Sequence, residues 1–398
     1  RPYEAYDYNI LHETFNYGIG AQYMINKGNY ITADCYADHF SSSYCFFKDN
    51  KTYNGKAGEE QVRKRTRNHN LSIKGIFKLG NRHKLSVGTE YIVDVLKSQT
   101  DNIAKEDAYT LALFAQDEIK LLRNLQALIG VRYIYHENFK NHATPNVALM
   151  YKPGKFNFRA SYAAGFRTPT LSELYATDIA KKNDRLTIGN LDLKSEKNNY
   201  FSLSAEYVHE RFSVSVNAFY NNIRDMIDYN TIATGDKAME QYGHKEVRQR
   251  DNIAEAKVHG INVSANAYLG AGFNLSGGYT HLNTQDVELE QPIDKSIKNA
   301  YNINAQWAHS WKIYRLNINL NGRINSKRFS KSYGYAPEYQ LWNLNTRHSF
   351  NLKSVIIEPG CGMENLFDYM DDRPYNSNYA TLTPGRSFYI SLSLKFKS

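Results

Sequence analysis

The sequence predicts an all-β protein, a transmembrane antiparallel up-and-down β-barrel, and three observations support this fold class. Apolar and polar residues alternate with a period of two along most of the 398 residues. The candidate strands are about 10–14 residues long, longer than the ~5–6 residues typical of a soluble sandwich. The links between the strands alternate between tight turns and long polar stretches. Counted in this way, the chain contains about 17 strands, whereas single-chain bacterial barrels have an even number.

The alternation gives each candidate strand one apolar and one polar face. In 201–207 and 212–220 the apolar side chains occupy every second position, and 388–396 repeats the pattern at the end of the chain. The polar positions are often Asn and Ser, as expected for a hydrated barrel lumen, whereas the wet face of a soluble sandwich is normally rich in Lys, Glu and Thr. The segments therefore predict strands that separate lipid from a polar interior.

The links are the strongest sequence evidence for a membrane barrel, because short turns at one rim and long loops at the other are typical of this architecture. Tight turns are predicted near 27–29, 80–82, 122–123, 152–155, 209–211, 270–271, 310–311 and 352–353. Long links are predicted near 41–62, 97–108, 137–143, 165–196, 225–248, 284–296, 327–338 and 367–384.

Composition excludes two broad classes. No apolar run approaches the ~18 residues of a membrane-spanning helix, which excludes a helical membrane protein. The net charge of +9 is spread along the chain, so no nucleic-acid partner is expected. The one dense cluster, Arg63, Lys64, Arg65 and Arg67, is interpreted as a solvated loop edge or as lumen-lining cations. The 32 Tyr and 19 Phe fit strands with aromatic rings where lipid meets water.

The cysteines and the start of the chain carry two further expectations. Cys35, Cys45 and Cys361 show no metal-binding spacing; Cys35 fits a small apolar strand position, and a Cys35–Cys45 bridge is left open. The chain opens at Arg1 without an initiator Met or a secretion signal. We expect residues 1–398 to be one barrel domain truncated at its N-terminus, since an odd strand count leaves a barrel incomplete.

Four tracts between residue 109 and the C-terminus carry a family resemblance. The first is 109–118 followed by 128–133, the second is 144–153, the third is 158–194, and the fourth is 364–368 with 384–388. In order and at the expected strand positions, they resemble the barrel motifs of TonB-dependent outer-membrane receptors. The motif residues on which the resemblance depends most are Gly165, Phe166, Arg167, Pro169, Asn190, Asn365, Leu366, Phe367 and Asp368.

The resemblance implies a barrel of about 22 strands, whose N-terminal plug domain and TonB box are absent here. It implies a bacterial outer-membrane receptor that imports a scarce metal complex, a ferric siderophore or haem, by TonB-coupled active transport. The implied partners are TonB, outer-membrane lipid and the metal-complex ligand, with a surface lipoprotein as a further candidate; no cofactor is implied. A cobalamin importer and a passive porin or adhesin barrel remain as alternatives. Haem is disfavoured because no His lies between Pro169 and Asn190.

No catalytic site is predicted, because the chain lacks G-x-S-x-G, H-E-x-x-H and P-loop motifs. No metal site is predicted either, because no ligand spacing connects His39, His244 and His281. Ligand contacts are expected from aromatic and cationic residues of the long links, which stack on flat ligands and hydrogen-bond anionic groups. The candidates are Tyr44, Phe47, Tyr53, Arg167, Tyr333, Tyr335, Arg373, Tyr375 and Tyr379. For Arg167, a role as a structural clamp for its loop is the favoured alternative.

Overall fold

Antiparallel strands make up most of this computed structural model, which describes residues 7–180, 184–330, 334–371 and 383–397. Within these residues, seventeen strands have ten or more residues, and this number confirms the count predicted from the alternation. They are β1 (Tyr8–Asn26), β2 (Asn29–Phe46), β3 (Glu60–Leu79), β4 (His83–Ser98), β5 (Ile103–Leu122), β6 (Leu125–His136), β7 (Lys140–Tyr151), β8 (Phe156–Arg167), β11 (Glu196–Val208), β12 (Phe212–Thr234), β13 (Glu246–Gly270), β14 (Phe273–Asp286), β15 (Asn299–Trp311), β16 (Tyr314–Asn325), β19 (Tyr339–Asn351), β20 (Val355–Glu364) and β21 (Ser387–Phe396).

Shorter elements lie in the links. Two helices, α1 (Leu171–Tyr175) and α2 (Gly235–Tyr242), were not predicted, nor were the strands β9 (Thr177–Ala180), β10 (Arg185–Ile188), β17 (Arg328–Ser330) and β18 (Gly334–Ala336). No helix in the described part of the chain is long and apolar enough to cross a membrane.

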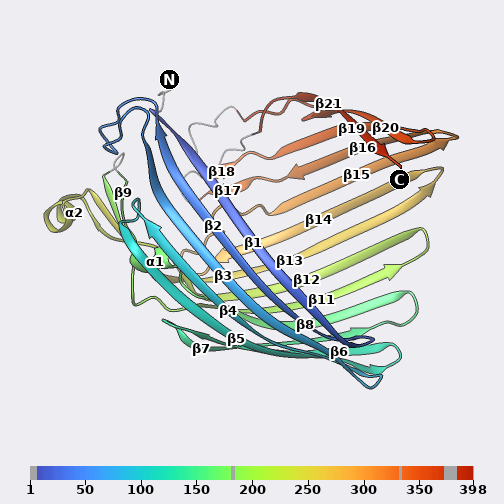
Figure 1. The fold of residues 1–398 in the computed structure, drawn as a ribbon, viewed down its shortest axis with the longest axis horizontal. Coiled ribbons are helices and arrows are strands. Elements are labelled where there is room, and N and C mark those ends of the chain that lie inside the picture. Colours follow the sequence, from blue (N-terminus) through green and yellow to red (C-terminus); the bar gives the residue numbers. More distant parts are fainter. Residues whose placement is uncertain (1–6, 181–183, 331–333, 372–382, 398) are drawn as a thin grey trace. The chain divides into compact units, whose positions relative to one another are not determined.

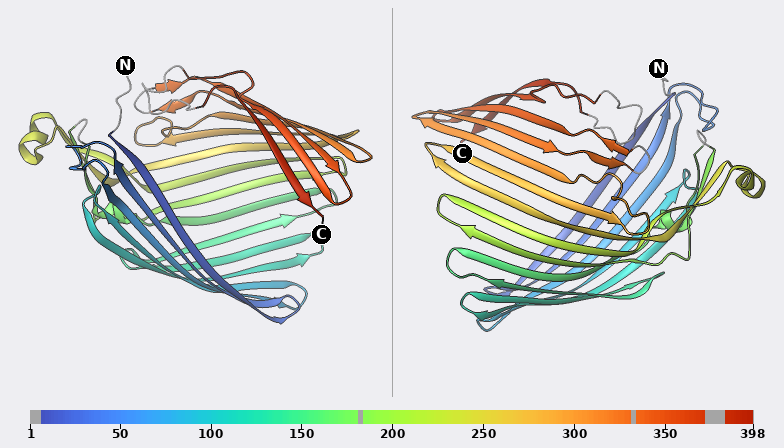
Figure 2. Two further views of the ribbon diagram at one scale, coloured as in Figure 1. Left: turned by 45° about the horizontal axis from the view of Figure 1, so that its top comes forward. Right: turned by 180° about the vertical axis from the view of Figure 1, so that it is seen from behind.

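The chain divides into two compact units. The first comprises Arg1–Ala148, Ala163–Asn199 and Ile223–Glu255, and the second comprises Leu149–Tyr162, Tyr200–Asn222 and Ala256–Ser398. In the first unit, β1 to β6 pair antiparallel with their neighbours in sequence order, and they are coloured blue to cyan in Figure 1. In the second unit, β14, β15, β16, β19, β20 and β21 form a similar succession of hairpins, which both views of Figure 2 show in yellow to red.

The predicted tight turns are confirmed, with one shifted by two residues. The link between β15 and β16 is 312–313 rather than 310–311. The predicted strict alternation of short and long links fails at two places, where a link predicted to be long is short. Only residues 99–102 separate β4 from β5, and only 137–139 separate β6 from β7, because these strands continue into segments that were assigned to long links.

Most large apolar side chains remain exposed, and they share one face of each strand. On β3 the exposed positions run through Leu71 and Ile73, and their neighbours Tyr91, Leu111 and Leu113 on β4 and β5 are exposed as well. Water would penalise such a surface, whereas the acyl chains of a bilayer accept it. The fold is therefore that of a transmembrane barrel, with its apolar face toward lipid.

The three cysteines are free. The disulfide left open between Cys35 and Cys45 is excluded, because both residues lie on the same extended strand, β2. Ten residues of strand separate their Cα atoms by about 33 Å, far beyond the reach of a disulfide.

Candidate functional site

The predicted site residues of the first unit lie where its long strands end and the links begin. We call this end, with the links 47–59, 168–195 and 235–245, the loop rim. Tyr44 lies two residues before the end of β2, Tyr53 lies in the first of these links, and Arg167 is the last residue of β8. The structure brings two of the predictions, Tyr44 and Tyr53, into contact.

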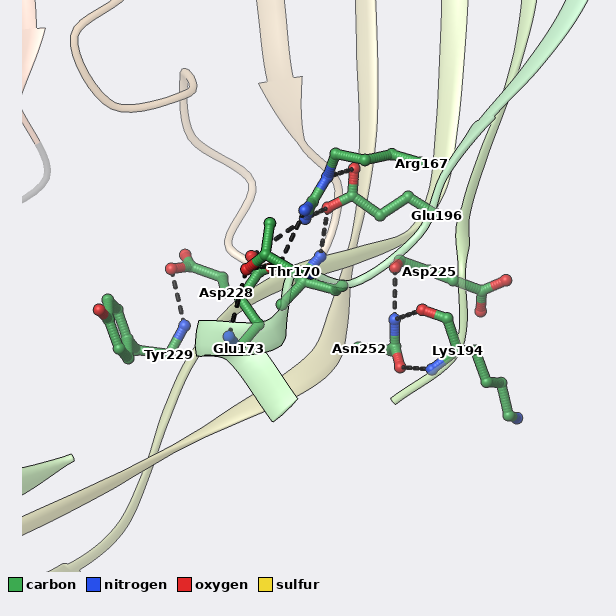
Figure 3. A network of polar contacts seen from close by, with 10 residues as sticks. Arg167, Thr170, Glu173, Lys194, Glu196, Asp225, Asp228, Tyr229 and Asn252 are labelled. Atoms are coloured by element: carbon green, nitrogen blue, oxygen red, sulfur yellow. Dashed lines mark hydrogen bonds and ion pairs between the residues drawn. The ribbon is translucent and has the colours of Figure 1, made fainter. Parts of the chain in front are cut away.

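Arg167 is engaged by two carboxylates of its own chain. Its Nε and Nη2 donate to the two carboxylate oxygens of Glu196 at 2.9 and 2.6 Å. Its Nη1 and Nη2 donate to Glu173 at 2.8 and 3.2 Å, as Figure 3 shows. All three guanidinium nitrogens thereby donate hydrogen bonds, and this bidentate geometry favours the clamp interpretation over a ligand contact.

The clamp continues into the backbone of neighbouring segments. Glu196 Oε1 also accepts the amide hydrogen of Ile227 at 2.8 Å, which ties β11 to β12. The Asn252 side chain accepts from the Lys194 amide at 2.7 Å and donates to the carbonyls of Lys194 and Asp225 (Figure 3). These bonds give partners to backbone groups next to the strand ends, where the ladder of strand hydrogen bonds stops.

The short helix α1 is held at both ends by motif residues. At its start Thr170 and Glu173 form a capping box, in which each side chain bonds the other residue's backbone amide. At its end the amides of Gly189 and Asn190 donate to the carbonyls of Ala176 and Glu173. A Cβ on Gly189 would lie 2.5 Å from the Leu174 carbonyl oxygen, so this approach requires glycine.

The remaining members of the Gly165–Pro169 motif also have structural roles. A Cβ on Gly165 would lie 2.3 Å from the Asn198 side-chain oxygen. The Phe166 ring stacks on His142 with centroids 4.3 Å apart, and Pro169 is buried. The motif therefore fixes the exit of the chain from β8, as expected for a stretch that must leave a strand and turn.

Acidification should loosen this clamp. Burial raises the pKa of Glu173, but hydrogen bonds from Arg167 and Thr170 outweigh burial and hold that pKa below its ordinary 4.5. A carboxylate with a lowered folded-state pKa contributes stability above its unfolded value, and this contribution is lost as the pH falls through the folded value. In the unmodified protein, we expect the midpoint temperature of thermal unfolding in detergent to decrease as the pH is lowered below 4.5. Part of this decrease should be missing in E173Q, and an identical pH profile for both proteins would contradict the prediction.

The first link carries an aromatic cluster around Tyr44 and Tyr53. The Tyr8 and Tyr44 rings stack at 4.4 Å, and Tyr53 meets Tyr44 edge-on at 5.0 Å. The guanidinium carbon of Arg63 lies 5.2 Å from the Tyr44 ring centroid and 5.4 Å from that of Tyr53. The predicted Phe47 does not share this packing and is 52% exposed. The cluster anchors the link to β1, β2 and β3, and its contact with a ligand stays a prediction.

Four other predicted residues lie outside the described residues, namely Tyr333, Arg373, Tyr375 and Tyr379. Tyr335 lies in β18, in the second unit, where its ring meets Phe329 edge-on at 5.3 Å and is 58% exposed. Its role as a ligand contact also stays a prediction.

The closing motif in the second unit ties together the two ends of the link before β21. Asn365, buried and at φ 51°, donates to the carbonyls of Tyr369 and Pro384 at 2.7 and 3.1 Å. Asp368 accepts from the Arg386 amide at 2.7 Å. The amide of Leu366 and the ring of Phe367 both contact Trp342 on β19. A left-handed backbone with side-chain bonds across the link is the turn chemistry that Asn and Asp favour.

Sequence reasoning missed an arginine cluster at the loop rim of the first unit. Tyr229 on β12 lies beneath two guanidinium groups, with Arg250 Cζ 3.6 Å and Arg248 Cζ 4.2 Å from its ring centroid. Arg250 Nη2 donates to the Tyr229 hydroxyl at 2.7 Å. Arg185 is on β10, which pairs parallel with β13 so that Arg185 faces Glu246 and Thr187 faces Arg248. The two-residue spacing of Arg248 and Arg250 could have shown that they share a strand face.

The carboxylates near this cluster are poor counter-ions. Glu246 approaches Arg248 Nε only to 3.9 Å. Burial and the nearby Asp101 carboxylate raise the pKa of Asp178, and Arg185 and Arg248 oppose that rise without cancelling it. Two cations therefore stack on one aromatic ring while the Glu246 carboxylate stays 3.9 Å from Arg248, and this arrangement suits an anionic, flat ligand.

No cluster of three or more candidate metal ligands occurs among the residues that the structure describes. His244 bonds Asp184 at 2.8 Å, and His281 bonds Asn299 at 2.9 Å. In both rings Nδ1 has a partner within the protein.

The comparisons with known proteins agree with this architecture. The family model for TonB-dependent receptor-like β-barrels matches residues 2–366. The chain belongs to the TonB-dependent receptor β-barrel family. Its members are transport receptors of the bacterial outer membrane rather than enzymes, as predicted.

Individual relatives are distant in sequence. The ferric enterobactin receptor of Pseudomonas aeruginosa is 23% identical over 372 residues, which cover 80% of this chain and 49% of the relative. A crystal structure of a variant of that receptor superposes with a TM-score of 0.79 at 18% identity, covering 98% of this chain and 62% of the other. The siderophore receptor PirA of Acinetobacter baumannii gives a TM-score of 0.74 at 16% identity, covering 97% of this chain and 62% of the other. The receptor barrel thus spans about half the length of the curated relative.

Proposed function

We propose that this receptor barrel belongs to an importer of anionic ferric siderophores that is driven by TonB. The family supports a transport receptor, and the relatives named above are siderophore receptors. Of the three candidate ligands, we propose a ferric siderophore rather than haem or cobalamin.

The observation that carries the proposal is the arginine cluster, in which Arg248 and Arg250 stack on Tyr229. Guanidinium groups bind oxyanions through paired hydrogen bonds, and an aromatic ring beneath them adds a stacking surface. Arg248 Nε is buried and has no hydrogen-bond partner. A bound oxyanion would supply the missing acceptor and would bond the cationic guanidinium more strongly than a neutral acceptor does.

Energy coupling is proposed on family grounds. We expect TonB to act through a plug domain and a TonB box that lie outside this sequence. Uptake of radiolabelled ferric enterobactin by cells that carry the full receptor should then stop when the proton-motive force is dissipated. Uptake that continues at an unchanged rate would point to a passive channel instead.

The double variant R248Q/R250Q should weaken the binding of ferric enterobactin by at least about a hundredfold, since two charge-assisted hydrogen bonds of roughly 1.5–3 kcal/mol each are lost. The measurement is a titration of the purified full receptor, followed by the quenching of tryptophan fluorescence. The matched control is K152Q/K155Q, which removes two cations from the tight turn between β7 and β8. Equal affinity in the two variants would show that the arginine cluster does not contact the ligand.

A further inference from the structure

A second group of cations lies near the loop-rim ends of two neighbouring strands of the first unit. Arg65 and Arg67 on β3 and Lys97 on β4 form what we call the cationic patch. The register places Arg65 directly opposite Lys97, and Arg67 opposite Val95 on one side and His39 on the other. Because strand residues alternate in direction, these side chains share one face.

This face is the one that meets lipid. The exposed positions of β3 read Arg65, Arg67, His69, Leu71 and Ile73 in order, while the residues between them are less exposed. The same face that carries the cations thus becomes apolar toward the middle of the strand. The apolar face of a membrane barrel contacts acyl chains. The interpretation of Arg65 and Arg67 as loop-edge or lumen-lining residues is therefore wrong, because they lie within β3 and on its lipid side.

Aromatic rings mark the depth of the patch in the membrane. Tyr91, Tyr109 and Tyr135 form a ladder on this face, with successive ring centroids 6.0 and 6.1 Å apart. Such rings occupy the boundary between acyl chains and headgroups. The register pairs Val93 with Tyr109, and Val95 with Arg67. Arg67 therefore lies two residues, about 7 Å, beyond the Tyr109 level toward the loop rim, at headgroup depth.

The charges of the patch are not neutralised by the protein. Within the part of the chain that the structure describes, the side chains of Arg65, Arg67 and Lys97 make no hydrogen bond and no ion pair. The neighbouring Lys64 and Arg63, by contrast, reach Asp101 and Gln99 at 3.7 and 3.2 Å. Three exposed like charges on adjacent strands repel one another unless an anion joins them.

Two carboxylates lie in the same rows of the sheet as Arg65 and Arg67, and each has another partner. Glu13 accepts the hydroxyl of Ser41 at 3.3 Å, and Asp107 pairs with Lys105 at 3.3 Å. The protein itself therefore offers no counter-ion that is committed to the patch.

A cavity adjoins the patch on the same strands. It measures about 400 Å³, and its lining includes Arg65, Arg67 and His39 together with one carboxylate, Glu13. The Nε2 atom of His39 is buried and has no hydrogen-bond partner. A buried ring nitrogen without a partner is rare, and an oxygen-rich group in this cavity would supply one.

We propose that the cationic patch binds the phosphorylated headgroup of an outer-leaflet membrane lipid, with its acyl chains lying over Leu71, Ile73 and Tyr91. Arginine pairs with phosphate oxygens through two parallel hydrogen bonds, and clusters of basic residues at headgroup depth recognise anionic lipids. The apolar continuation of the same face supplies the surface for the acyl chains. The inference depends on membrane insertion and is independent of which ligand the receptor imports.

Native mass spectrometry of the full receptor in detergent tests this proposal. The probes are diphosphorylated lipid A, the same lipid without its phosphates, and inorganic phosphate. We expect the unmodified protein to retain diphosphorylated lipid A and to lose about a hundredfold in apparent affinity when the phosphates are removed, since three basic residues then lack their anionic partner. The triple variant R65Q/R67Q/K97Q should show a loss of the same size.

The matched control is K78Q/R82Q/K120Q, which removes three cations from the opposite ends of the same hairpins. It should bind like the unmodified protein. Equal binding by the triple variant, or equal loss in the control, would overturn the proposal. So would equal binding of lipids with and without phosphate by the unmodified protein, a comparison that requires no variant to fold. Competition by millimolar inorganic phosphate would show a site for free anions rather than for lipid.

Discussion

Replacing Arg167 by alanine is expected to destabilise the loop rim by about 2 kcal/mol. Glu173 and Glu196 have side chains only 13% and 15% exposed, and both accept hydrogen bonds from the guanidinium. Without Arg167, two partly buried carboxylates would face each other unpaired. Removing one partner of a fully buried pair costs about 3–5 kcal/mol, and the 42% exposure of Arg167 reduces that cost through solvent screening.

The charge-conserving variant R167K separates geometry from charge. Lysine keeps the positive charge but cannot reach two carboxylates with paired hydrogen bonds, so most of the loss should remain. The measurement is the midpoint of thermal unfolding in detergent, with hydrogen exchange of the α1 amides as a local probe. The triple variant R167M/E173Q/E196Q should recover part of the stability because no charge is left unpaired. If R167A unfolds at the same temperature as the unmodified protein, the clamp contributes nothing to the stability of the fold.

The elements predicted correctly are those within the membrane, because lipid on one side and water on the other impose the period-two pattern. The short links that were predicted as long ones lie beyond the lipid. At the start of β5, Lys105 and Asp107 are exposed and polar, yet the strand pairing with β4 persists through Glu106. Where both faces are wet, the hydrophobic alternation disappears while the backbone hydrogen bonds remain. β12 and β13, with 23 and 25 residues, extend beyond the apolar band for the same reason.

The site was less predictable because its contacts join distant parts of the sequence. The motif identified Arg167 and its position at a strand end, but its partner Glu196 is 29 residues away and could not be assigned from local spacing. The arginine cluster depends on the parallel pairing of β10 with β13, an exception to the antiparallel order. The lipid-side position of Arg67 required the register of β3 with β4, since a slip by one residue would turn it into the lumen.

Replacing Gly272 by valine is expected to prevent the folding of the hairpin between β13 and β14. Gly272 has φ +85°, and a Cβ built on it would lie 1.9 Å from the carbonyl oxygen of Ala308. The turn is fixed in this position, because Ala308 N donates to Gly272 O at 3.0 Å and Trp307 Nε1 donates to Ala271 O at 3.1 Å. A β-branched residue in the left-handed region costs about 1–3 kcal/mol, and the backbone clash adds a displacement of β15.

The control G80V separates these two costs. Gly80 also has a positive φ, +64°, but no atom lies within 4 Å of its built Cβ. The G80V variant should therefore lose only the conformational term and still insert into the membrane, whereas G272V should give little folded protein. The readout is the fraction that resists unfolding in SDS without heating, compared with total receptor on the same gel. Equal folded fractions for the two variants would mean that the contact between Gly272 and Ala308 does not limit assembly, and that left-handed backbone strain alone sets the cost.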